Sequence, residues 1–151
     1  MTMDVASLIE RDEWKGIAVE KKQGPGLLRW RVPVLQPGDG GSHPMLLQVV
    51  WPYAEQGSAA MPSDQLFEEL RVFEDRLCAA WEQDALAVLT AVLTFDGAKQ
   101  WVFYTNDVQA CTRRLNEMPQ VEEPYPIEVT ARPDGTWSFL RDEILRTVDT
   151  R

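Results

Sequence analysis

One continuous stretch, residues 63–95, constrains the fold more than any other part of the chain. It reads SDQLFEELRVFEDRLCAAWEQDALAVLTAVLTF. In its first two-thirds, apolar side chains recur every three or four residues, the spacing of one face of an amphipathic helix. These side chains are Leu66, Leu70, Phe73, Leu77 and Trp81. Ser63 is a suitable N-cap, and Asp64 lies favourably in the positive first turn.

The end of this stretch, residues 86–95, predicts a strand rich in β-branched residues. Neither of its alternating faces is strongly polar, so we expect it to be shielded on both sides of a sheet. Asp96 and Gly97 follow and predict a tight hairpin turn, because this pair readily adopts the positive φ that such turns require. The chain then returns in an aromatic-rich strand over residues 99–105.

Alternation, caps and turn residues predict the remaining elements. Before the long helix we expect a short helical or loose segment at 1–12 and strands at 14–19, 27–35 and 45–53. After it we expect a helix at 106–118, a strand at 127–132 and a terminal helix with Trp137, Leu140, Ile144 and Val148 on one side.

Two of these strands carry more specific expectations. In residues 27–35, Leu28, Trp30, Val32 and Val34 alternate with Arg29 and Arg31, as in a half-buried strand. Pro33 suits an edge position in the sheet, because proline has no N–H to donate. In residues 127–132 we expect alternate side chains to point inward, and these are Ile127, Val129 and Ala131.

The order of elements predicts an α+β fold. From residue 45 onward it runs strand, helix, strand, strand, helix, strand, which is the ferredoxin-like split βαβ (βαββαβ) arrangement. We expect an antiparallel sheet with the helices on one face, preceded by an extra N-terminal β-hairpin that can extend the sheet or fold over it. No boundary interrupts the chain, so residues 1–151 are predicted to form a single domain.

The charge distribution limits the possible partners. The chain has a net charge of −9, and residues 64–84 hold seven carboxylates against Arg71 and Arg76. Direct binding of nucleic acid is not expected, because it requires clustered lysine and arginine. An acidic face that meets a basic protein is expected instead, and solubility is the simpler explanation of the same charge.

No segment predicts a membrane or secretory role. The longest nearly uncharged apolar run, residues 85–95, is too short to span a bilayer. The N-terminus does not have the charged and apolar regions of a signal peptide, so a cytoplasmic location is expected.

The residues that most often carry chemistry are few. Cys78 and Cys111 have no CxxC or metal-ligand spacing and are expected to be reduced residues in or near the core. His43, the only histidine, has no second ligand or nearby nucleophile in the sequence and is interpreted as structural or solvated. We therefore expect no metal and no cofactor.

Three segments resemble a bacterial family catalogued as domain of unknown function 695. They are MPSDQLFEELRVFEDRL, LTFDGAKQWVFYTND and DGTWSFLRDEIL. The matching positions, within residues 45–145, are Met61-Pro62, Glu74-Asp75, Thr94, Gly97, Phe103-Tyr104, Asp134 and Trp137. Leu140 departs from the family pattern, which has a tyrosine there.

This resemblance implies a fold and a bacterial source but no established activity. Some members resemble, or occur alongside, ferredoxin-like protein inhibitors of a ribonuclease. Small acidic domains of this kind also occur as immunity proteins. The resemblance therefore favours inhibition by protein binding.

The sequence places the candidate site on the outer face of the long helix. The residues expected to bind a partner are Glu68, Glu69, Arg71, Glu74 and Asp75. The first hypothesis is a non-enzymatic protein-binding module, similar to an inhibitor or immunity protein, that acts on a basic protein. The alternative is a small enzyme with a carboxylate-centred site on the same helix, which requires two carboxylates to converge on one cavity. A solvated, salt-bridged helix face is the third interpretation.

Overall fold

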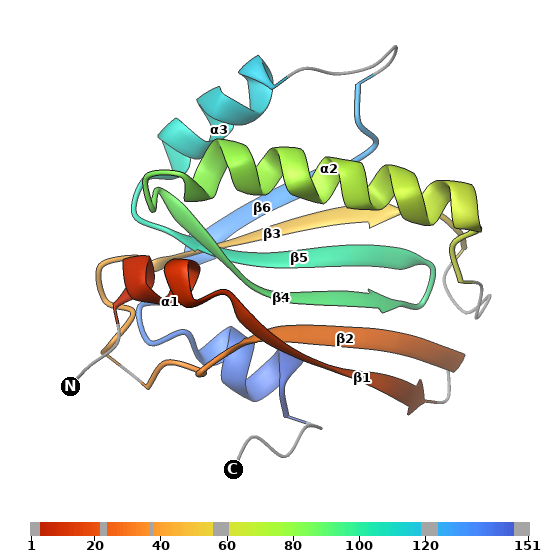
Figure 1. The fold of residues 1–151 in the computed structure, drawn as a ribbon, viewed down its shortest axis with the longest axis horizontal. Coiled ribbons are helices and arrows are strands. Elements are labelled where there is room, and N and C mark those ends of the chain that lie inside the picture. The colour runs from red at the N-terminus through yellow and green to blue at the C-terminus, as the bar shows by residue number, and fades with distance from the viewer. Residues whose placement is uncertain (1–3, 22–23, 37, 56–60, 119–123, 147–151) are drawn as a thin grey trace.

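A computed structural model describes residues 4–21, 24–36, 38–55, 61–118 and 124–146. Within them, an antiparallel six-stranded sheet has the order β1-β2-β4-β5-β3-β6 (Figure 1). The strands are β1 (Glu13–Lys21), β2 (Gly24–Val32), β3 (Met45–Pro52), β4 (Ala87–Phe95), β5 (Ala98–Thr105) and β6 (Glu128–Pro133). The helices are α1 (Val5–Arg11), α2 (Asp64–Glu82), α3 (Val108–Glu117) and a short π-helix, η1 (Phe139–Ile144).

The stretch that dominates the sequence forms the centre of the molecule. The Ser63 side chain caps α2 by accepting a hydrogen bond from the Leu66 backbone N–H. The apolar stripe of α2 packs on the sheet, with Leu70, Phe73, Leu77 and Trp81 buried as predicted. β4 is buried along almost its whole length, and Asp96 and Gly97 form the predicted turn with positive φ.

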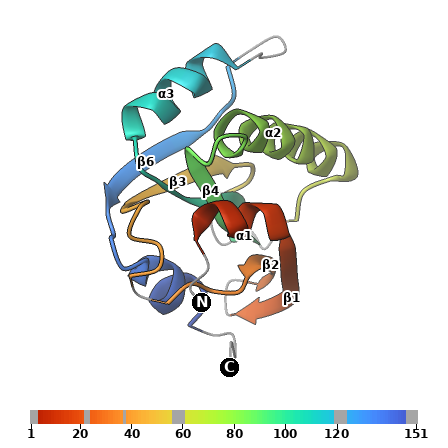
Figure 2. The same ribbon diagram turned by 60° about the vertical axis from the view of Figure 1, so that its left-hand side comes forward.

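The sheet has helical elements on both sides, whereas the prediction placed helices on one face only. We call one side the α2 face. It is covered by α2 and α3, which pack on strand residues such as Leu89, Trp101 and Phe103. The opposite side, the α1 face, is covered by α1 and the segment around η1 (Figure 2). Because β4 and β5 are central and covered twice, their residues are buried on both sides.

The β1–β2 pair extends the sheet instead of folding over it. All nine residues of β1 pair with β2, and β2 pairs in turn with β4 through residues 27–30. The predicted edge position for Pro33 is therefore wrong, because β2 lies between two strands. Pro33 follows the last residue of β2, a place where its missing N–H interrupts no ladder.

The last strand differs from its prediction. Ile127, Val129 and Ala131 were expected to point inward, but all six residues of β6 are exposed, with Val129 40% exposed. β6 pairs with β3 at the sheet edge. Ile127, just before the strand, does pack against the core. Alternation in the sequence cannot distinguish a covered strand from one beyond the reach of the helices.

The predicted C-terminal helix is shorter, and Val148 lies outside the described residues. Trp137 adopts a positive φ of 58° just before η1 and is buried. Its ring stacks on Tyr104 at 4.4 Å, and its indole N–H donates to the His43 carbonyl. Asp134 accepts hydrogen bonds from the Tyr104 hydroxyl and from the backbone N–H groups of Ser138 and Phe139. This buried network attaches the C-terminal segment to the α1 face.

Tyr104→Phe tests the contribution of this network to stability. The Tyr104 hydroxyl donates to Asp134 and accepts from the buried Leu140 N–H, so its removal takes two hydrogen bonds from the network. We expect the free energy of unfolding to fall by about 1–3 kcal/mol in urea titrations. Tyr125→Phe is the matched control, because the half-buried Tyr125 hydroxyl accepts from Arg76 nearer to solvent. Equal losses of unfolding free energy in the two variants would contradict the proposed contribution of this network to stability.

Candidate functional site in the cleft between α2 and the β1–β2 pair

Three of the five residues predicted to bind a partner form an exposed ion-pair chain on α2. Arg71 donates to Glu68 at 2.5 Å and to Asp75 at 2.7 Å. All three side chains are more than half exposed. The hydrogen bond from Arg71 lowers the pKa of Glu68, which keeps this carboxylate ionised. The spacing of three and four residues along one helix explains the chain.

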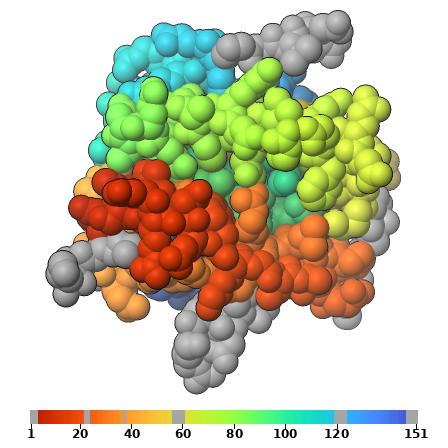
Figure 3. Space-filling model, in the orientation of Figure 1, coloured from red at the N-terminus to blue at the C-terminus, as the bar shows by residue number. Residues whose placement is uncertain are grey.

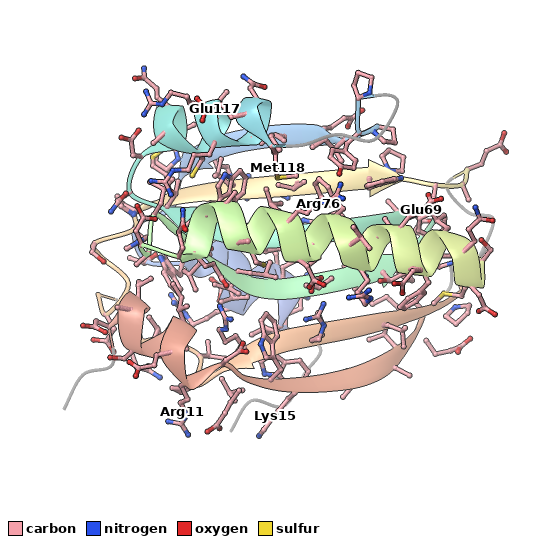
Figure 4. All side chains as sticks on the ribbon, turned by 45° about the horizontal axis from the view of Figure 1, so that its top comes forward. Arg11, Lys15, Glu69, Arg76, Glu117 and Met118 are labelled. Atoms are coloured by element: carbon pink, nitrogen blue, oxygen red, sulfur yellow. The ribbon has the colours of Figure 1, made fainter. Side chains whose placement is uncertain are left out.

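The other two predicted residues lie elsewhere. Glu69 is exposed on the side of α2 turned toward β3, the side that also carries Arg76 (Figure 4). Glu74 points toward the sheet, where its side chain is only 13% exposed. The five residues therefore occupy three different surroundings, and Glu74 lies apart from the four exposed ones.

Glu74 belongs to a row of buried charges between α2 and β2. It accepts from Arg29 at 2.6 Å and from the Trp101 indole N–H at 2.8 Å. Two helical turns further on, Glu82 accepts from Arg31 at 2.7 Å. Arg29 and Arg31 alternate on β2, and the indole ring of Trp14 lies against both guanidinium groups at 4.9 and 4.7 Å. We call five of these side chains the charge ladder: Trp14, Arg29, Arg31, Glu74 and Glu82.

Arg31 is the most connected member of the charge ladder. Its side chain is 4% exposed and also donates to Asp12, which follows α1, and to the Leu89 carbonyl of β4. Glu82 accepts in addition from the Leu89 N–H. The sequence prediction placed Glu82 on the outer face of α2 and Arg31 on the polar side of a half-buried strand. Both are buried because α2 lies over this part of β2.

Beside the charge ladder, toward the start of α2, an open cleft of about 410 Å³ separates α2 from the β1–β2 pair (Figure 3). Gly16 and Ala18 of β1 are paired with Arg29 and Leu27 of β2, so these four residues face the cleft together. The small side chains at Gly16 and Ala18 leave the space open. Most of the remaining lining is apolar, and it includes Val92, Phe67 and Ile17.

Lys99 and Thr94 contribute polar groups to this cleft. They are directly paired across β4 and β5, so they share the α2 face. Lys99 is 5% exposed, and its ammonium group lies 5.0 Å from the Phe67 ring centre and 5.8 Å from that of Trp101. Burial lowers the pKa of Lys99. The cleft can therefore supply positive charge inside apolar walls.

The cysteines and the histidine have structural positions. Both thiols are free, Cys111 is buried and Cys78 is half-buried, in agreement with the prediction. Burial raises the pKa of both thiols, and nearby Glu82 and Glu74 raise that of Cys78 further, so neither is an activated nucleophile. His43 is buried, with Nε2 2.6 Å from the Ala85 carbonyl and Nδ1 2.7 Å from the Ser42 hydroxyl.

Within the described residues, neither a metal-ligand cluster nor a membrane-spanning helix is found. Across the described parts of the chain, no group of three His, Cys, Asp or Glu side chains could hold a metal ion. In the same residues, no helix combines the length and apolar character needed to cross a bilayer.

Further hollows lie outside this cleft, in the part of the chain that the structure describes. One, of about 390 Å³, lies between α2 and α3 and is lined in part by Arg76, Glu117 and Met118 (Figure 4). Another, of about 550 Å³, is lined by Arg11, Lys15 and Trp30, among other residues. Arg11 is paired with Glu13 across an exposed surface.

The sequence prediction missed Trp14, Arg29 and Lys99 as site residues. A signal for Lys99 was present, because it alternates with Trp101 and Phe103 and therefore shares their buried face. A lysine in phase with buried aromatic residues is unusual, since lysine is rarely fully buried without a partner. No comparable signal pairs Arg29 with Glu74, because they are 45 residues apart.

Comparisons with known proteins identify a family but no activity. A family model described as "Family of unknown function (DUF695)" matches residues 12–144. The family expected from the resemblance is therefore confirmed. No curated protein and no solved structure matches the chain.

Adjacent carboxylates on α2 provide a test of the charge ladder. Glu74→Gln leaves Arg29 without its ionic partner in a partly buried place, and we expect a loss of about 1–3 kcal/mol in unfolding free energy. Asp75→Asn removes a charge whose side chain is 62% exposed, and we expect a loss below about 0.5 kcal/mol. Urea unfolding monitored by tryptophan fluorescence measures both. A larger loss for Asp75→Asn would show that the ladder does not stabilise the fold.

Proposed function

The chain belongs to the DUF695 family, whose function is unknown, and we propose from its geometry that it is a non-enzymatic protein-binding module. The outer side of α2 carries this proposal. After Glu74, Glu82 and Asp84 have paired with arginines of the same chain, four exposed carboxylates remain on α2, two of them bonded to Arg71. These carboxylates are Asp64, Glu68, Glu69 and Asp75.

Apolar groups next to these carboxylates support a protein as the partner. Phe67 is 40% exposed beside Glu68, and Met61 is also exposed just before α2. Aromatic and methionine side chains are enriched in protein interfaces, and the charged groups around them act mainly on association rate and specificity. The partner that fits this surface is a protein with a basic patch.

The contacts of α2 favour binding over catalysis. In the alternative hypothesis, two carboxylates of α2 converge on a cavity to transfer protons. Glu68 and Asp75 instead share Arg71 on the exposed surface, and Glu74 is bound to Arg29 and Trp101. Within the described residues, no contact favours a carboxylate-centred enzyme.

We also infer a ferredoxin-like architecture for the part of the chain from β3 to β6. The strand order β4-β5-β3-β6, with α2 and α3 as the two crossing helices on one face, supports this assignment. The β1–β2 pair is then an N-terminal hairpin added to the β4 edge. On this scaffold, an inhibitor or immunity-like protein that acts on a basic protein in the cytoplasm is the role that we propose.

Removal of the exposed carboxylates tests this function. In the triple variant Glu68→Gln, Glu69→Gln and Asp75→Asn, the buried Glu74 is unchanged, so the fold should remain intact. We expect the wild-type chain to retain a basic protein from a lysate of its source cells at low ionic strength. The triple variant should lose it, as should the wild type in about 0.3 M salt, where the Debye length is shorter.

A matched variant controls for net charge. Glu128, Asp142 and Glu143 are also exposed but lie on β6 and η1, away from α2. Their replacement by Gln, Asn and Gln changes the net charge by the same amount and should leave capture unchanged. Equal capture by wild type and the α2 variant, or loss in both variants, would contradict this site.

A further inference from the structure

Lys99 is a buried cation to which the described residues supply no anionic partner. In the described part of the chain, no carboxylate lies within ion-pair distance of its ammonium group, and no acceptor is hydrogen-bonded to it. Arg29 and Arg31, its neighbours on the α2 face, are both paired. A buried charge without a partner is unfavourable in free energy, so a bound anion would stabilise the ammonium group of this lysine.

Glu74 is the carboxylate that acts on the pKa of Lys99, and it already accepts hydrogen bonds from other residues. Glu74 raises the pKa of Lys99, but burial outweighs this effect and lowers that pKa overall. The Glu74 oxygen Oε1 accepts from both Arg29 and Trp101. Glu74 therefore serves the charge ladder and leaves Lys99 facing the cleft.

Two further donors line the same cleft. Thr94, the cross-strand neighbour of Lys99, is buried, and its hydroxyl makes no hydrogen bond to any described residue. Arg29 donates one N–H to Glu74, while 38% of its side chain stays exposed. An anion in the cleft can be contacted by an ammonium, a hydroxyl and a guanidinium group.

The rest of the cleft suits an apolar group. Its wall includes Val92, and its rim includes two of the large exposed apolar side chains of the molecule, Leu27 and Phe67. The volume of about 410 Å³ lies within the range of small-molecule sites.

We propose that this cleft binds a small amphiphilic monocarboxylate, with its carboxylate at Lys99 and its aliphatic tail along Leu27, Val92 and Phe67. A single charge fits better than several, because the chain has a net charge of −9 and Glu68 and Asp75 lie exposed on α2. Polyanions such as nucleotides meet this repulsion, whereas a monocarboxylate gains one paired charge and a buried tail. The site shares Phe67 with the proposed protein-binding surface, but its ligand and its charge are different and it does not rest on that function.

Calorimetric titration with octanoate tests the site. We expect saturable binding of octanoate to the wild-type chain, with octan-1-ol and octylamine at least tenfold weaker because they lack the carboxylate. Inorganic phosphate should not compete. Absence of octanoate binding, or equal binding of octan-1-ol, would overturn the proposal.

Matched lysine variants locate the interaction. Lys99→Met keeps an unbranched side chain in the buried position while it removes the charge, and we expect octanoate binding to weaken at least tenfold. Lys99→Gln provides a second uncharged variant if the methionine variant does not fold. Lys15→Met is the control, because Lys15 is exposed in a different hollow on β1 (Figure 4). Octanoate binding that is unchanged in a folded Lys99 variant would overturn the assignment.

An NMR titration gives an independent readout. Saturating octanoate should raise the pKa of Lys99, followed through its side-chain ¹³Cε signal, because a bound carboxylate favours the charged ammonium. Backbone amide shifts should be largest at Gly16, Ala18 and Leu27, which line the cleft. An unchanged Lys99 pKa, or shifts confined to the groove between α2 and α3, would contradict the site.

Discussion

The arrangement of the elements depends on the contacts of one buried group, the guanidinium of Arg31. It bonds Asp12 after α1, Glu82 at the end of α2 and the Leu89 carbonyl of β4, and Trp14 of β1 covers it. A guanidinium can satisfy several acceptors in one plane, which a lysine cannot. A buried ion pair contributes little net stability, but loss of one partner leaves a costly charge. The contacts of Arg31 therefore act mainly on specificity, because a shift of α2 along the sheet would separate Glu82 from Arg31.

The apolar contact of α2 with the sheet supplies the stability that the ion pairs of Arg31 do not. Its four buried side chains can each contribute about 1.5–3 kcal/mol relative to exposure, as an upper estimate. Phe73 and Trp81 make edge-to-face contacts with Trp101 and Phe103 of β5. These contacts set the distance between α2 and β5. The charge ladder fixes the helix over β2. The cleft opens beyond the end of the ladder, where β1 presents only the small residues Gly16 and Ala18 on the α2 face.

Several positions that carry the family resemblance have structural roles. Gly97 has a positive φ, and its carbonyl accepts from the N–H groups of Tyr53 and Ala54. Asp134 and Trp137 hold the C-terminal segment to the α1 face. Glu74 holds α2 to β2. Thr94 differs, because its side chain lines the cleft beside Lys99. The polar groups that carry the family resemblance are thus largely paired within the fold.

The sequence by itself determined most of the helices and strands and their order along the chain, because periodicity and caps are local properties. Ser63 caps α2 and the Asp96-Gly97 turn forms as expected. It also determined which stripe of α2 is buried. It could not separate Glu74 from Asp75, although one is held under the helix and the other is solvated. That difference depends on Arg29, which reaches Glu74 only because β2 joins the sheet beside β4. Only the tertiary structure decided the strand order, the burial of Arg31 and the cleft around Lys99, since each results from contacts between segments far apart in the chain.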